Sequence, residues 1–377
     1  GSKITCSGGS YAYVESALGE FPGFIVNWLY FIGWGVLGSA AVINIFADSI
    51  SVFFPVFLKS LPRAILFSVL LGFMVLINIR GTKQSVGFLK FITIIKLLPL
   101  FAIVIFGVRH IKAANLNWEH LPTIKTFGDT ALILFFAFAG FETTLNASGE
   151  VKNSKRTIPL GIFFGGILVL IVYCSLQIVT QGVLGAQATE FKNAPLAEVA
   201  NQIVGPVGAS ILLIGAAVSC FGITCGDVLA SPRLLFAGAN AGLFPKFLGK
   251  VHPKFATPHL AVISYAACIF IFAVSGGFRQ LAVLASAAIL LIYLAVILAT
   301  IKLRLKKDKI SDATYFKIPG GFLIPLIGIA AIVWLLTSLK KWEILSTIIF
   351  VVAICFIYLI MKNFKKVKEA QFGEPTA

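Results

Sequence analysis

Long apolar runs alternate with short polar segments along the whole chain. A helix needs roughly 20 apolar residues to cross a hydrocarbon core of about 30 Å. Ten runs meet this requirement closely enough to predict membrane-spanning helices, and three of the connections between them are longer, near 109–126, 184–205 and 302–321. The predicted spans are 22–47, 64–80, 86–108, 127–148, 157–183, 206–238, 258–275, 280–301, 322–339 and 343–361.

The pattern predicts an all-α, polytopic transmembrane helical bundle that forms a single transmembrane domain over residues 1–377, because no linker or low-complexity tract divides it. Composition agrees, since 58% of the residues are hydrophobic and 12% are charged. A soluble domain has about 45–50% apolar and about 25% charged residues. The mean hydropathy of +0.96 points the same way.

The net charge of +16 could indicate a nucleic-acid partner, but Lys and Arg also collect in the cytoplasmic loops of membrane proteins. With the N-terminus placed in the cytoplasm, the inside segments hold 19 of the 31 basic residues, the outside segments nine and the spans three. This asymmetry predicts cytoplasmic termini in a plasma or inner membrane and makes nucleic acid an unexpected partner.

Enzyme chemistry has little support in the sequence. Six cysteines are scattered without C-x-x-C spacing, and the four histidines show no ligand spacing. There is no phosphate-binding loop and no nucleophile–base constellation. We therefore expect neither a metal nor a cofactor, and no catalytic residues.

The fourth span departs from the pattern. Its apolar run, 131–141, has 11 residues and would measure about 16 Å as a helix, which is half a membrane. Glu142 and further polar residues follow directly. Irregular backbone at membrane depth is tolerated only beside protein or a water-filled cavity, and discontinuous helices mark binding sites in transporters. We predict two half-helices broken between Ala137 and Glu142; the alternative is a glycine kink with the glutamate near the interface.

Five segments in this order resemble the amino acid–polyamine–organocation (APC) permeases: GGSYAYVESALGEFPGFIVNWLYFIGW (8–34), NIRGTKQS (78–85), IKLLPL (95–100), FAFAGFETTLNASGEVKNSKRTIP (136–159) and GDVLASPRLLFAGANAGLFPKFLGKVHPKFATP (226–258). The resemblance implies a five-plus-five inverted-repeat fold with two added helices, in which the ten spans are helices three to twelve. It also implies that the first two helices, which include the other broken helix and its carboxylate site, are absent.

The resemblance further implies secondary transport of an amino acid by alternating access, through proton coupling or exchange. The substrate ammonium would meet the carbonyls of Ala137, Phe138 and Ala139 beside Gly140, and Phe136 would close over it as an aromatic gate. A competing interpretation is a membrane-embedded sensor or partner subunit with the same fold and no turnover. The sequence does not identify the amino acid or the oligomeric state.

Three charged residues inside the spans are candidates for coupling, because a charge at the bilayer centre costs about 2.5–3.5 kcal/mol on insertion scales. Lys96 and Asp227 come out at similar mid-depth on spans that run in opposite directions, which permits an ion pair or separate satisfaction by backbone and water. By resemblance, Lys96 occupies the place of a second sodium ion and implies sodium-independent transport. Glu142 would either carry a proton or cap the second half-helix.

Overall fold

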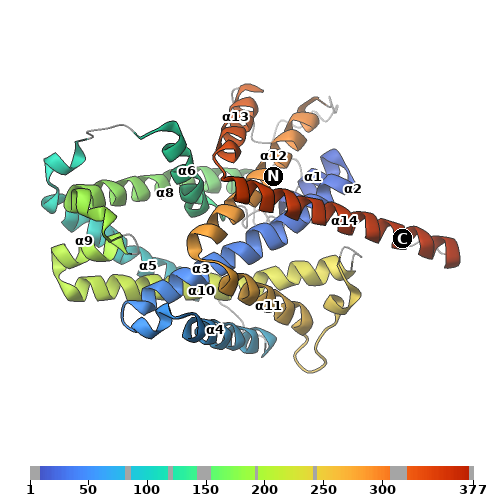
Figure 1. The fold of residues 1–377 in the computed structure, drawn as a ribbon. Coiled ribbons are helices and arrows are strands. Elements are labelled where there is room, and N and C mark those ends of the chain that lie inside the picture. The colour runs from blue at the N-terminus through green and yellow to red at the C-terminus, as the bar shows by residue number, and fades with distance from the viewer. Residues whose placement is uncertain are drawn as a thin grey trace. The chain divides into compact units, whose positions relative to one another are not determined.

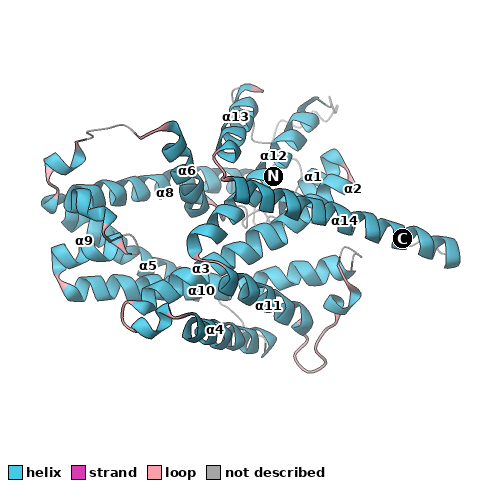
Figure 2. Cartoon of the chain, in the orientation of Figure 1, coloured by secondary structure: helices cyan, strands magenta, loops and turns pink. Residues whose placement is uncertain are grey.

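The computed structural model describes residues 9–80, 86–117, 122–141, 154–191, 194–240, 244–305 and 321–372. All regular elements in these ranges are helical, as Figure 2 shows. Each predicted span corresponds to helix: α2 (Glu20–Trp28), η1 (Leu29–Val36) and α3 (Leu37–Ser51) for the first, then α4 (Ser60–Arg80), α5 (Val86–Gly107), α6 (Ile124–Phe138), α8 (Ser154–Leu184), α10 (Pro206–Asn240), α11 (His259–Ser275), α12 (Phe278–Leu305), α13 (Leu323–Thr337) and α14 (Lys341–Phe372).

Six helical segments among the described residues are long and apolar enough to cross a membrane. Two further apolar helices, α11 and α13, are shorter. The prediction of a polytopic helical membrane protein is therefore confirmed. The six segments are Glu20–Ser51, Ser60–Arg80, Arg156–Thr189, Pro206–Asn240, Phe278–Leu305 and Lys341–Lys362.

Two short helices occur where the hydropathy pattern predicted only connections. α1 (Gly9–Leu18) precedes the first span. α9 (Pro195–Val204) lies in the long connection between α8 and α10. It begins with a proline in its first turn, where the missing N–H costs nothing, and ends at Gly205 with φ +84°. Single helical turns are also present: η2 (Pro55–Leu58), η3 (Val108–His110), η4 (Ala113–Leu116), η6 (Gly185–Thr189) and η7 (Lys246–Gly249).

The chain forms two compact units, each made of segments distant in sequence. The helices of both units are labelled in Figure 1, which colours the chain from blue at the N-terminus to red at the C-terminus. Unit 1 comprises residues 1–34, 123–164 and 282–377, and unit 2 comprises 35–122 and 165–281. Whether the two units together form the predicted single transmembrane domain over residues 1–377 stays a prediction.

Unit 1 is held together by close helix approach and by aromatic contacts. A Cβ atom added at Gly33 on η1 would lie 2.5 Å from Ala288 Cβ on α12, so only glycine fits there. Small residues allow such approach between membrane helices. The Tyr358 ring of α14 lies 4.9 Å from Phe21 and 5.1 Å from Phe24, centroid to centroid. A core on α6, α12 and α13 contains Leu132, Val283, Ala287, Leu290, Ile332 and Leu339.

Unit 2 is built on α3, which packs against α10 and α11, while α4 packs on α11. A polar network ties these helices together at Asn44, which is buried. The Asn44 Nδ2 group donates to the Ala273 carbonyl of α11 at 3.2 Å, and its Oδ1 accepts from Arg63 Nη2 at 2.7 Å. A second core contains Ile103, Val172, Leu176, Val179, Val183, Leu184, Val199 and Ala200.

Candidate functional site

α6 ends inside the interval predicted for the break. It starts at a capped terminus, where Thr123 Oγ1 accepts from the Thr126 amide at 3.2 Å. Its last intrahelical bond runs from the Ala139 amide to the Phe135 carbonyl at 3.1 Å, and α6 stops at Phe138. The predicted end of this helix is thus confirmed. Glu142 and the predicted second half-helix fall on residues 142–153, outside the described ranges.

The backbone at Ala139 and Gly140 turns the chain out of the helix. Ala139 is extended, with ψ 159°. Gly140 has φ +119°, a conformation that residues with a Cβ rarely adopt. No atom lies within 4 Å of a Cβ built on Gly140, so the backbone angle rather than crowding requires glycine there. The Ala-Gly pair therefore determines where α6 ends.

Aromatic rings surround the end of α6 within unit 1. The rings of Trp34 and Phe136 are 5.6 Å apart, centroid to centroid. Tyr293 of α12 lies between the two sides of the turn, 5.9 Å from Phe135 and 5.7 Å from Phe141. Sequence reasoning missed Tyr293, although a single tyrosine in the aliphatic run ILLIYLAVILA was a usable signal. These contacts fix both the last turn of α6 and the segment that leaves it.

The end of α6 has the chemistry of a cation site. Peptide dipoles place partial negative charge at a helix C-terminus. Each carbonyl oxygen has two lone pairs and can accept a bond from a ligand in addition to a protein donor. Ala137 and Phe138 are exposed at this end, while Phe136, Ala139 and Gly140 are partly buried. The arrangement suits a small ammonium group next to an aromatic wall, where cation–π attraction adds to the dipole.

Asp227 on α10 in unit 2 accepts a hydrogen bond from one hydroxyl group, which in turn contacts a second. Ser39 Oγ donates to Asp227 Oδ2 at 3.0 Å, and the Tyr265 hydroxyl lies 3.3 Å from the same Oγ. Ser39 and Tyr265 are buried, and Asp227 is partly buried. The three side chains link α10, α3 and α11, which contact one another.

Lys96 is partly buried on α5, which packs against α10. The ion pair that the matching depths permitted is not formed: within the described ranges, the ion pair present joins Arg63 and Asp48, with Nη1 2.7 Å from Oδ1. Asp227 is instead satisfied by Ser39, which corresponds to the alternative of separate partners.

The Arg63 network was not foreseen, because hydropathy placed both of its charged groups near span ends. Arg63 also donates to the Asn44 carbonyl at 3.1 Å and covers the Phe67 ring at 5.6 Å. In the part of the chain that the structure describes, no group of three or more His, Cys, Asp or Glu side chains could hold a metal ion.

Comparison with known proteins identifies similarity over nearly the whole chain. A family model described as amino acid permease matches residues 1–370. The serine/threonine exchanger SteT of Bacillus subtilis is 30% identical over 347 residues, which cover 90% of this chain and 77% of SteT. The branched-chain amino acid permease BcaP and the methylthioribose transporter of B. subtilis are each 26% identical and cover 95% of this chain and 80% of their own length. These matches indicate a transporter rather than an enzyme, as predicted, and the chain belongs to the amino acid permease family.

Proposed function

We propose that this permease carries amino acids across a cell membrane by alternating access, with the substrate bound at the end of α6. The observation that carries the proposal is the termination of α6 at Phe138 and the turn at Gly140. Irregular backbone within a membrane is tolerated only where it faces protein or lines a water-filled cavity, and discontinuous helices mark binding sites in transporters. A substrate site at the end of α6 accounts for the early end of this helix.

In the proposed complex, the substrate ammonium lies at the negative end of the α6 dipole and donates hydrogen bonds to the carbonyls of Ala137, Phe138 and Ala139. Phe136 covers the substrate, and its contact with Trp34 at 5.6 Å holds the ring in place. Tyr293 supports the turn through Phe135 and Phe141. A gate built on aromatic stacking can open by rotating one ring without breaking a hydrogen bond.

Coupling is proposed to be by exchange or by protons, without sodium. The name of the exchanger SteT, at 30% identity, favours exchange. Lys96 lies on α5, which packs against α10, and a lysine there would disfavour a sodium ion at the same place. Asp227, bonded to Ser39, is the second coupling candidate, and Glu142 is the third.

The substrate class rests on the family and on the relatives' names. Two of the three relatives are named for amino acids, serine and threonine for one and branched-chain amino acids for the other. The third is named for methylthioribose, which lacks an ammonium group. The small residues Ala137, Ala139 and Gly140 leave side-chain selection to other parts of the site. We propose a plasma or inner membrane location with both termini of the chain in the cytoplasm.

Reconstituted transport tests the proposal. The protein, expressed from its complete reading frame, is purified into liposomes loaded with unlabelled serine, threonine or isoleucine, and uptake of the same labelled amino acid is measured. Exchange predicts uptake that depends on the internal amino acid and not on external sodium. Proton symport predicts uptake into empty liposomes that a proton ionophore abolishes. Loaded liposomes without protein measure leakage.

A sensor or partner subunit gives a different pattern in the same preparation. It would bind an amino acid in calorimetry and show no uptake under any gradient. Saturable uptake that depends on the internal amino acid or on a proton gradient supports transport. Binding without uptake contradicts it.

A further inference from the structure

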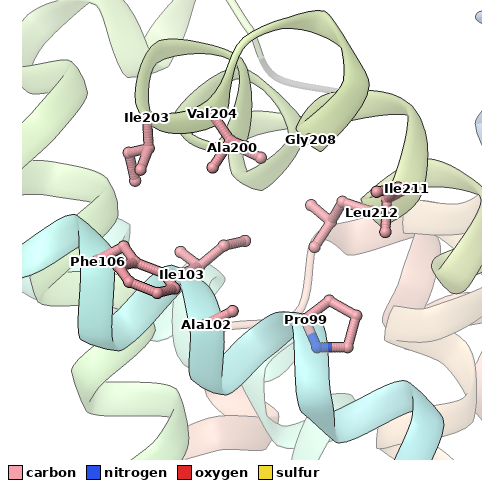
Figure 3. A pocket seen from close by; sticks show the side chains of 10 residues that line it. All are labelled: Pro99, Ala102, Ile103, Phe106, Ala200, Ile203, Val204, Gly208, Ile211 and Leu212. Carbon is pink, nitrogen blue, oxygen red and sulfur yellow. The ribbon is translucent and has the colours of Figure 1, made fainter.

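An apolar cavity of about 230 Å³ lies in unit 2 between α5 on one side and α9 with the start of α10 on the other (Figure 3). Side chains from the two sides point toward one another across it. All of its lining is hydrocarbon or glycine: Pro99, Ala102, Ile103, Phe106, Ala200, Ile203, Val204, Gly208, Ile211 and Leu212. The polar candidates of unit 2, Lys96 and Asp227, do not line it.

The cavity lies within two to three turns of the C-terminal end of α5 and of the start of α10. Its α5 residues are one to eight positions before the helix end at Gly107, which is about 2–12 Å along the axis. Its α10 residues are two to six positions after Pro206, about 3–9 Å. The rim is open to the surroundings, since Phe106 is 54% exposed, Val204 64% and Ile211 56%.

Two basic residues follow the α5 lining of the cavity closely in sequence. Arg109 and Lys112 follow the last lining residue of α5, Phe106, by three and six positions and are both exposed. Their backbone is fixed, because the His110 ring bonds the Phe106 carbonyl at 3.2 Å and the Lys112 amide donates to the Gly182 carbonyl at 3.0 Å.

Neither basic side chain is neutralised by the described protein. In those ranges the ion pair formed joins Arg63 and Asp48, far from this segment in sequence. Glu198 of α9, an acidic residue close to the cavity lining in sequence, accepts from Asn201 at 3.3 Å and from Gln202 at 3.3 Å on its own helix. Within the described ranges, both basic groups are therefore available to an anion from outside the protein.

We propose that this cavity is a binding site for one anionic phospholipid. One acyl chain lies between α5 and the α9–α10 corner, and the phosphate lies over Arg109 and Lys112. Along α5, the apolar lining residues are followed by the basic residues Arg109 and Lys112. A phospholipid has the same order, with its acyl chain followed by its charged headgroup. A lipid in this position would hold α9 against α5, two elements that already contact each other.

Native mass spectrometry of the purified protein tests the site. The protein is delipidated in detergent and titrated with dioleoyl phosphatidylglycerol, or with dioleoyl phosphatidylcholine, which has the same chains and no net charge. Two basic groups at a membrane surface favour an anionic lipid by roughly 30-fold. We expect one phosphatidylglycerol to bind at concentrations where phosphatidylcholine is not retained.

Two variants separate the acyl chain from the headgroup. Ala102→Trp fills the cavity and should weaken binding of both lipids about tenfold or more. Its control, Ile105→Trp, places the same ring on α5 at a position that is 66% exposed and does not line the cavity. The pair Arg109→Gln with Lys112→Gln should abolish the preference for phosphatidylglycerol, and Lys59→Gln, also exposed, should leave it unchanged.

Each outcome decides one part of the proposal. Equal lipid binding by Ala102→Trp and Ile105→Trp would overturn the acyl-chain site. An undiminished phosphatidylglycerol preference in the double glutamine variant would overturn the headgroup site. If Ala102→Trp does not fold, as judged by gel filtration and melting, Ala102→Leu replaces it, and the surface variants still test the charge. Weakened binding in the first variant and lost preference in the second support the proposal.

Discussion

At the scale of single residues, the account depends most on Gly140. Its φ of +119° lies in a region that is essentially reserved for glycine, and its surroundings impose no steric limit. Glycine is therefore required at this position by the backbone conformation and not by the packing around it. A substitution here changes where α6 ends without introducing a clash, so its effect on function reports on the turn itself.

Gly140→Ala is expected to cost about 1–3 kcal/mol of backbone strain and to lower the initial rate of amino acid uptake at least about fivefold. Gly165→Ala is the matched control, because Gly165 lies in α8, has no positive φ and also has no atom within 4 Å of an added Cβ. Alanine in a helix interior should stabilise by about 0.5–1 kcal/mol. Equal uptake by the two variants would contradict the role of the turn.

Lys96→Ala is expected to lower uptake more than it lowers thermal stability, because it removes a partly buried charge beside α10. Uptake in proteoliposomes and melting in detergent are compared with those of Lys302→Ala, an exposed lysine at the end of α12. Normal uptake by Lys96→Ala would remove Lys96 from the coupling mechanism and leave it a structural role.

At the scale of helices, hydropathy predicted the spans well and the interactions between them poorly. Nine of the ten predicted spans coincide with described helix, and the fourth, 127–148, is helical as far as Phe138, with residues 142–148 outside the described ranges. α9 was missed because ten residues are too few to cross a membrane, so the signal used for spans could not detect it. Tyr293 and Asn44 were missed because their partners lie on other helices, and one sequence does not show which helices meet.

Gly33→Ala tests close packing in unit 1. The added methyl group would lie 2.5 Å from Ala288 Cβ and 3.3 Å from a Phe350 ring carbon, so η1 and α12 must separate. We expect a loss of about 1–3 kcal/mol in stability, the usual cost of overpacking. Gly72→Ala on α4, where no atom lies within 4 Å, is the control and should melt at or above the wild-type temperature. Equal melting temperatures for the two variants would contradict the packing of η1 on α12.

Arg63→Gln tests the network that joins α3, α4 and α11. It removes the 2.7 Å contacts to Asp48 and Asn44 and should cost about 1–3 kcal/mol, because the Arg63 side chain is only 19% exposed. A double-mutant cycle with Asp48→Asn, followed by thermal melting, isolates the ion pair. Strictly additive losses would show that Arg63 acts through Asn44 and not through Asp48.

At the scale of the whole molecule, the family could be predicted from five ordered motifs, and the match over residues 1–370 confirms it. The end of α6 was also predictable, because an apolar run of 11 residues is too short to span. The interaction partners of Lys96 and Asp227 could not be predicted from the sequence. Depth along two helices gives no information on rotation about each axis, and Asp227 bonds Ser39 from a third helix.

Substrate protection at the turn tests the central claim most directly. In a background in which the six cysteines are replaced, Ala139→Cys is treated with a water-soluble thiol reagent, with and without a transported amino acid. Lys125→Cys, exposed in the first turn of α6, is the control, and Ala137→Cys replaces Ala139→Cys if that variant does not transport.

The account predicts that substrate at ten times its half-saturating concentration slows modification at residue 139 about tenfold, because the unoccupied fraction falls as 1/(1 + [L]/Kd). Modification at residue 125 should not change. Unaltered modification at residue 139, in a protein that transports that amino acid, would show that the substrate does not bind at the end of α6.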